Sequence, residues 1–220
     1  SVEGGCKTDK SVERLPGASM PTAAKPPDNR PHHVFPASRA RHLDTRSRRI
    51  LYQPGRLARR YVQPGDRVLD FGCGPGFFTR EFAKRVGDTG MVIAVDLQED
   101  MLRTLKERME EEGLMHRVMT HRCAPETIGL PQEMNGTIDV AFAIFVVHEA
   151  PDPRNVFREI ALLLAPKGRL FYSEPPVIVT GKEFQVNLTE AERAGFTVLE
   201  RRFFFVKRAA LLQKIASGSL

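Results

Sequence analysis

The sequence predicts an α/β protein with a mostly parallel, doubly wound sheet and helices on both faces. Two patterns carry this prediction. From residue 67 onward, short runs of β-branched and aromatic residues alternate with amphipathic segments, as expected for strands buried between two helical layers. Near the end, FTVLERRFFFVKRAALLQKI holds two apolar runs with almost nothing between them. Since a crossover helix has no room there, these runs are expected to pair as an antiparallel hairpin.

The expected elements follow one another in a regular order. Five strands are expected at 67–71, 91–96, 117–121, 138–145 and 169–174, and the hairpin within 196–215 adds two more. Helices are expected at 76–86, 98–112, 153–165 and 188–194, with a short irregular helix after the third strand. Gly168 and Gly195 follow the last two helices and are expected to end them.

The front of the chain has a different composition. Residues 1–37 are rich in Pro, Gly, Lys and small polar residues, which predicts a flexible arm. Residues 38–61 carry apolar residues at helical intervals, divided by Pro54-Gly55, and predict a helical preface to a core at 62–214. Residues 1–60 hold 13 Lys/Arg against 5 Asp/Glu. Such a segment could attract RNA or an acidic substrate, but a solvated basic helix is the commoner explanation.

Composition also bounds the class of protein. No apolar run approaches the ~20 residues that span a bilayer, and the polar start does not resemble a signal peptide. A cytoplasmic protein without a transmembrane segment is therefore expected. The three cysteines, Cys6, Cys73 and Cys123, lie far apart without a CxxC pair, which predicts neither a disulfide framework nor a metal site.

The stretch VLDFGCGPGFFT joins the first strand to the next helix, where a doubly wound sheet binds its ligand. A dinucleotide site would read G-x-G-x-x-G, but here the third glycine comes one residue early. Asp70 before the glycines would repel a pyrophosphate and suits a cationic amine. Asp96, at the end of the second strand, can accept both hydroxyls of a ribose. The ligand predicted is a nucleoside with an amino-acid-like end, and S-adenosylmethionine has those parts.

These motifs are similar to those of a known family. VLDFGCGPGFFT resembles the first motif of class I S-adenosylmethionine-dependent methyltransferases, VIAVDLQEDML resembles the second, and GRLFYSEPP falls at the fifth strand. The resemblance covers roughly residues 38–214 and implies a Rossmann-like, seven-stranded methyltransferase domain within 38–220. The layout looks like that of compact enzymes that include the menaquinone and ubiquinone biosynthesis methyltransferases.

The resemblance also implies roles for individual residues. Asp70 would help at the amino group of the cofactor, Asp96 would hold its ribose, and the backbone of the third-strand end would meet its adenine. Where the family commonly has an acid there, this chain has Cys123-Ala124, with Glu126 as a possible substitute. Cys73 is expected to be a small buried residue rather than a reactive thiol. The cofactor-binding residues implied are Asp70, Gly72, Cys73, Gly74, Gly76, Asp96, Leu97, Met101, Cys123 and Ala124.

Two residues near the ends of the fourth and fifth strands are candidates for chemistry. His148 is the candidate general base because its ordinary pKa is about 6.5 and it follows a strand end; a structural histidine is the alternative. Glu174 could bind substrate or receive a proton, or be a hydrogen-bonded strand-end carboxylate. Tyr52, Arg46 and Arg49 could reach the methionine carboxylate, or belong to an exposed basic face.

The function expected is methyl transfer from S-adenosylmethionine to a small or lipidic acceptor, leaving S-adenosylhomocysteine. The short segment PPVIVTGKEFQVN leaves little structure to recognise a macromolecule, and the motif of base methylation is absent after the fourth strand. An RNA or protein methyltransferase that docks through the basic segment is one alternative. A cofactor-binding protein without turnover is another.

Overall fold

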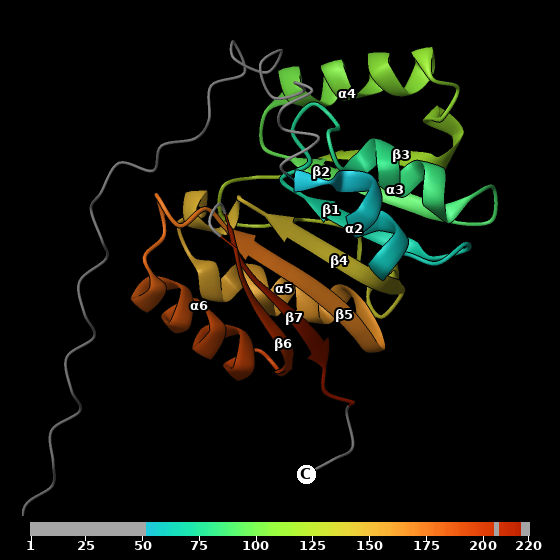
Figure 1. Cartoon of the computed structure of the whole chain (residues 1–220). Helices are drawn as coiled ribbons and strands as arrows, with labels where there is room; N and C mark the ends of the chain where they lie inside the picture. The colour runs from blue at the N-terminus through green and yellow to red at the C-terminus, as the bar shows by residue number, and fades with distance from the viewer. Residues whose placement is uncertain (1–51, 205–206, 217–220) are drawn as a thin grey trace, which may run out of the picture. The chain divides into compact units, whose positions relative to one another are not determined.

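Seven strands form one sheet in the computed structural model, which describes residues 52–204 and 207–216 (Figure 1). The sheet has the order β3-β2-β1-β4-β5-β7-β6. The five strands from β3 to β5 are parallel, and β7 and β6 run antiparallel at one edge. The expected mostly parallel sheet with a closing hairpin is therefore confirmed. The strands are β1 (Arg67–Phe71), β2 (Met91–Asp96), β3 (Val118–Arg122), β4 (Ile138–Ile144), β5 (Leu164–Glu174), β6 (Phe196–Phe204) and β7 (Lys207–Lys214).

The α-helices lie on both faces of the sheet (Figure 1). They are α2 (Pro54–Tyr61), α3 (Thr79–Val86), α4 (Glu99–Glu111), α5 (Pro153–Leu163) and α6 (Gly181–Arg193). Successive strand residues enter opposite cores: Val68 packs with residues of α2, α3 and α4, whereas Leu69 packs with residues of α5 and α6. Side chains alternate between the faces of a strand, so the apolar residues of β1 can fill both layers.

One expected helix end is wrong. Helix α5 ends at Leu163, β5 starts at Leu164 without a loop, and Gly168 lies inside the strand rather than at a helix end. A Cβ atom at position 168 would lie 2.8 Å from Ala165 O and 3.1 Å from Ile138 O. Glycine is needed here because backbone approaches backbone, which is a second common reason for glycine in an element.

Two other segments differ from expectation in extent. Helix α6 begins at Gly181, seven residues before the expected start at 188, because Thr180 and Glu183 form a capping box. Each side chain of that box satisfies a backbone N–H that the first turn leaves unpaired. After β3, the irregular helix reduces to a 3₁₀ turn at Gln132–Met134 and an isolated bridge between Ala124 and Thr127.

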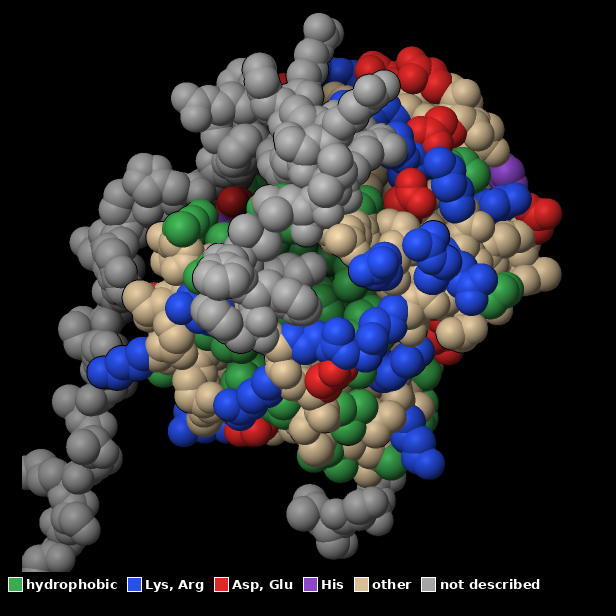
Figure 2. Space-filling view, viewed as in Figure 1, with side chains coloured by type: hydrophobic (Ala, Val, Ile, Leu, Met, Phe, Trp, Pro, Cys, Tyr) green, Lys and Arg blue, Asp and Glu red, His purple; other side chains and the backbone are tan. Residues whose placement is uncertain are grey.

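The expected arm at 1–37 and most of the preface at 38–61 lie outside the described residues, so those boundaries stay predictions. The described remainder of the preface is α2, whose Arg56, Arg59 and Arg60 are exposed. Figure 2 shows Lys and Arg side chains gathered on the face viewed. Within 52–204 and 207–216, no helix is long and apolar enough to cross a bilayer; the cytoplasmic location stays a prediction.

Candidate functional site

The glycine loop after β1 lies at the carboxyl end of the parallel strands. Gly72 and Gly74 have φ values of 74° and 53°, a region that favours glycine. A Cβ atom at Gly72 would lie 2.4 Å from Val146 Cγ2, whereas one at Gly74 would meet nothing within 4 Å. Gly72 therefore packs against the loop after β4, and Gly74 leaves open space above the backbone.

Asp96 ties this loop to the end of β2. Its Oδ2 accepts the Gly74 N–H at 2.8 Å, and its Oδ1 accepts the Gln98 N–H at 2.9 Å. Burial raises the pKa of Asp96, and these backbone hydrogen bonds oppose the rise. Each carboxylate oxygen has a further lone pair, so Asp96 can hold the loop and still accept hydroxyl groups from a ligand.

Asp70 lies on β1, just before the glycine loop, and does not line the cavity of the site. Its Oδ2 accepts a hydrogen bond of 2.6 Å from the Thr79 hydroxyl at the start of α3. Burial raises the pKa of Asp70 to about 7, and the nearby charge of Asp96 acts in the same direction. Thr79 did not stand out in the sequence, since a threonine at the start of a helix is ordinary.

One cavity of about 470 Å³ runs from the glycine loop to the loops after β4 and β5. Volumes of about 300–1,000 Å³ are typical of small-ligand sites. Most of the expected cofactor residues line it, namely Gly72, Cys73, Gly74, Asp96, Leu97, Met101, Cys123 and Ala124. Gly76 does not, because its Cα faces the side chain of Leu105 on α4. Residues far apart in the sequence thus meet around one cavity.

The cavity also has an aromatic wall that sequence periodicity did not reveal. It includes Phe71, Phe77, Phe78 and Phe145. Phe145 directly follows β4 and has a φ of 60°, which is strained for a bulky side chain. Its N–H donates to Ser173 O at 2.8 Å, and its ring packs edge-on against Tyr52 with 5.2 Å between centroids. The feature that marks Phe145 is its positive φ, which the structure shows and the sequence does not.

Several other expected residues have clear positions. Tyr52 lines the cavity, whereas Arg46 and Arg49 lie outside the described residues. Glu126 is exposed and does not line the cavity. Burial, with the charges of Asp70 and Asp96, raises the pKa of the Cys73 thiol, which favours the protonated form. Within 52–204 and 207–216, no three His, Cys, Asp or Glu side chains gather to hold a metal ion.

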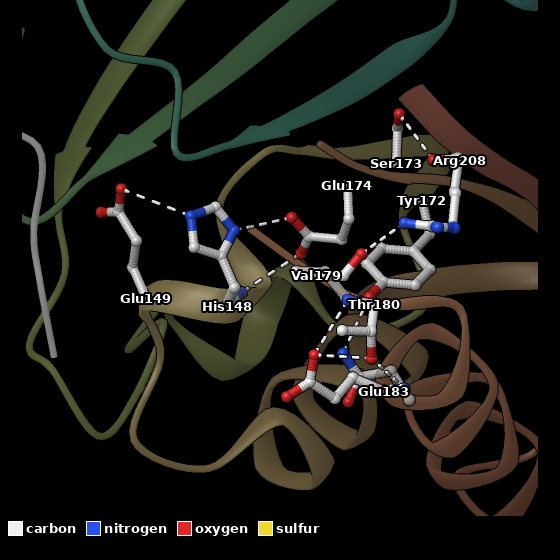
Figure 3. Close-up of polar contacts among 10 residues, drawn as sticks. His148, Glu149, Tyr172, Ser173, Glu174, Val179, Thr180, Glu183 and Arg208 are labelled. Carbon is white, nitrogen blue, oxygen red and sulfur yellow. Dashed lines mark hydrogen bonds and ion pairs between the residues drawn. The ribbon is translucent and has the colours of Figure 1, made fainter. Parts of the chain in front are cut away.

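At the other end of the cavity, His148 meets Glu174 (Figure 3). His148 lies in a 3₁₀ turn at Val147–Glu149, and Glu174 is the last residue of β5. Their Nδ1 and Oε2 atoms are 2.6 Å apart, and the backbone N–H of His148 donates to Glu174 Oε1 at 3.2 Å. His148 lines the cavity with a side chain 16% exposed, whereas the Glu174 side chain is fully buried and does not line it.

The two groups shift each other's protonation. Burial raises the pKa of Glu174, against the opposing effect of His148. Burial alone would lower the pKa of His148, but the hydrogen bond and charge of Glu174, with the charge of Glu149, outweigh it and raise the pKa. Glu149 Oε1 lies 4.0 Å from His148 Nε2. The pair therefore holds its shared proton to a higher pH than an ordinary histidine does.

The loop from Pro175 to Thr180 forms the rim beside this pair. Pro175 and Ile178 line the cavity. Arg208 on β7 donates from its guanidinium to Val179 O, and the Thr180 capping box closes the loop (Figure 3). Ile178 is 59% exposed and Val177 is 92% exposed. The rim is thus apolar and open to solvent.

Comparison with known proteins places this geometry in a family. Residues 68–168 match the family model described as a methyltransferase domain. The ubiquinone/menaquinone biosynthesis C-methyltransferase UbiE of Ectopseudomonas mendocina is 33% identical over 51% of this chain and 43% of its own length. That of Bordetella parapertussis is 33% identical over 54% of this chain and 44% of its length. The chain thus spans less than half the length of these curated relatives.

A solved structure extends the similarity to most of the chain. A SAM-dependent methyltransferase from Aquifex aeolicus is 26% identical, with a TM-score of 0.74, and the match covers 83% of this chain and all of that one. The cavity fits the cofactor of such proteins because Gly74 leaves room above the loop and Asp96 retains acceptor capacity. Residues 68–168 therefore match a methyltransferase domain, and the fold is that of class I S-adenosylmethionine-dependent methyltransferases, whose cofactor is S-adenosylmethionine.

Proposed function

We propose that this protein transfers a methyl group from S-adenosylmethionine to a small, largely apolar acceptor. The observation that carries the proposal is the single cavity that joins the glycine loop to His148. A cofactor held at one end and an acceptor at the other would share this space without intervening water. When bound, S-adenosylmethionine supplies a methyl group made electrophilic by its positively charged sulfur.

The chain's own residues would do most of the positioning, which is the main task in such a transfer. Gly72, Gly74 and Asp96 would hold the nucleoside and amino-acid parts of the cofactor, with Leu97 and Met101 against the adenine. The aromatic wall would exclude water from the reacting atoms. His148 faces the end of the cavity left for the acceptor.

The rim supports an acceptor of small size and apolar surface. Pro175 and Ile178 present hydrocarbon at the entrance, and Val177 stands almost wholly in solvent beside them. Exposed apolar groups at a cavity entrance mark a site that receives apolar ligands. The UbiE relatives are named for ubiquinone and menaquinone biosynthesis, and this similarity also supports a small or lipidic acceptor.

The proposal can be tested with methyl-labelled S-adenosylmethionine and cell extract, followed by separation into small-molecule, lipid, RNA and protein fractions. Label in the small-molecule or lipid fraction is expected. Asp96→Ala is the control for cofactor dependence, since it should reduce the label that the added protein produces above that of the extract alone. Label confined to RNA or protein would refute the small acceptor, and failure to bind S-adenosylhomocysteine in calorimetry would refute the whole proposal.

A further inference from the structure

Glu174 is a buried carboxylate that contacts His148, a residue of the cavity wall. Its side chain has no exposed surface and does not line the cavity. Oε1 accepts the backbone N–H of His148, and Oε2 contacts His148 Nδ1. Because the chain's own donors occupy both oxygens, Glu174 acts on a ligand only through His148.

This contact selects one form of the imidazole ring. A neutral imidazole carries its proton on one nitrogen, and the hydrogen bond made by that nitrogen decides which. Donation from Nδ1 to Glu174 leaves Nε2 as the acceptor. Nε2 lies on the opposite edge of the ring, on the side of Glu149, which also lines the cavity (Figure 3). The basic nitrogen therefore faces the space left for the acceptor.

We propose that Glu174 is a positioning residue that keeps His148 with its proton on Nδ1, so that Nε2 removes a proton from a hydroxyl group of the acceptor. The inference rests on the proposed function. In this step the acceptor O–H bond breaks, the proton binds Nε2, and the electron pair stays on the acceptor. The acceptor is then a weakly acidic hydroxyl compound, a phenol or an enol, on an apolar body.

The charges around the cavity favour a neutral hydroxyl over other proton-bearing groups. Among the described residues that line it, none is Lys or Arg, so a carboxylate or phosphate would enter without a permanently charged cationic side chain beside it. Beside His148, the surrounding surface is largely apolar, and burying a charged group there costs far more than burying a hydroxyl. Glu149 would favour an ammonium group instead, and the binding of benzylamine tests that alternative.

The first experiment reads the ring form of His148 in the wild-type protein. Nitrogen-15 chemical shifts of the histidine rings distinguish a protonated from an unprotonated ring nitrogen, and loss of one signal in His148→Gln assigns the residue. In wild-type protein with S-adenosylhomocysteine bound, above the pKa of His148, the expected result is a protonated Nδ1 and an unprotonated Nε2. A ring with its proton on Nε2 would overturn the proposal.

Two matched variants separate positioning from charge alone. Glu174→Gln removes the carboxylate on Nδ1, and Glu149→Gln removes the one nearest Nε2. The pKa of His148 should fall in both variants, because both carboxylates raise it, and only Glu174→Gln should mix the two ring forms. Equal ring populations in wild type and Glu174→Gln would contradict a positioning role. If Glu174→Gln does not fold, the nitrogen-15 shifts of His148 in the wild-type protein still decide which ring nitrogen carries the proton.

The acceptor class is tested with para-nitrophenol, whose absorbance reports its ionised form, against para-nitroanisole, which lacks the hydroxyl. With S-adenosylhomocysteine bound, para-nitrophenol should bind about tenfold or more tightly than para-nitroanisole. Its ionised absorbance should appear below its own pKa in wild type and be lost in His148→Gln. Equal binding, no binding of para-nitrophenol, or tighter benzylamine binding that depends on Glu149 would overturn the hydroxyl assignment. Absent binding of S-adenosylhomocysteine would instead refute the proposed function.

Discussion

Gly72 and Val146 meet so closely that a Cβ atom at position 72 would lie 2.4 Å from Val146 Cγ2. This contact joins the loop after β1 to the loop after β4, which lie side by side because β1 and β4 are neighbours in the sheet. The two loops carry opposite ends of the site: Gly74 lies on the first and His148 follows the second. Their relative placement therefore depends on a residue without a side chain.

Gly72→Ala and Gly74→Ala form a matched pair with different expected outcomes. Both add a methyl group at positive φ, which costs roughly 1–2 kcal/mol of folding free energy. Gly72→Ala should lose a further ~1–3 kcal/mol through the clash with Val146. Gly74→Ala has free space in the protein and should mainly weaken cofactor binding. Thermal unfolding and calorimetry with S-adenosylhomocysteine would measure both, and equal stability of the two variants would contradict the clash.

Asp96→Ala should weaken binding of S-adenosylhomocysteine by ~1.5–3 kcal/mol, as for lost hydrogen bonds to a charged carboxylate. The structure adds a second reason, because Asp96 also accepts the Gly74 and Gln98 N–H groups. Asp96→Asn keeps one acceptor oxygen and should show a smaller loss. Calorimetric affinities check the order, and an unchanged affinity in Asp96→Ala would remove the ribose assignment.

Stability should fall with rising pH where Asp70 ionises. The folded pKa of Asp70 is raised from 3.8 to about 7, so its stabilising contribution is present below the unfolded pKa and is lost as pH rises through the folded pKa. Asp70→Asn cannot ionise and should lose less stability between about pH 4 and about pH 7. Denaturant unfolding across this window measures the difference, and parallel curves for the two proteins would contradict it. Thr79→Val removes the hydroxyl donor that lowers the pKa of Asp70, so it should extend the fall to higher pH.

Gly168→Ala should destabilise the protein more than Gly195→Ala. At position 168 a Cβ atom would meet backbone oxygens of Ala165 and Ile138, which cannot move without disturbing the sheet. At position 195 it would meet nothing within 4 Å, and only the φ of 96° is unfavourable. Midpoints of urea unfolding compare the two. A larger loss in Gly195→Ala would show that β5 relaxes around the added methyl group.

Part of the site was predictable because several of its residues lie at or just after the ends of strands. Buried strands show as apolar runs, and the loops after parallel strands meet at one edge of the sheet, so the glycine loop, Asp96 and His148 could be expected there from local patterns. The Phe145 backbone conformation, the Thr79 contact with Asp70 and the role of Gly168 were not predictable. Each depends on atoms from segments distant in the sequence or on a single dihedral angle.

The amino-acid sequence by itself determined the α/β class, the hairpin at the sheet edge and the residue types around the cofactor, because these follow from local periodicity and turn chemistry. Tertiary structure alone decided that Glu174 lies behind His148 rather than in the cavity. The two residues are 26 positions apart, and their contact depends on how the ends of β4 and β5 align. Hydrophobic patterning places a strand in the sheet, but the direction of one polar side chain at its end depends on the neighbouring strand.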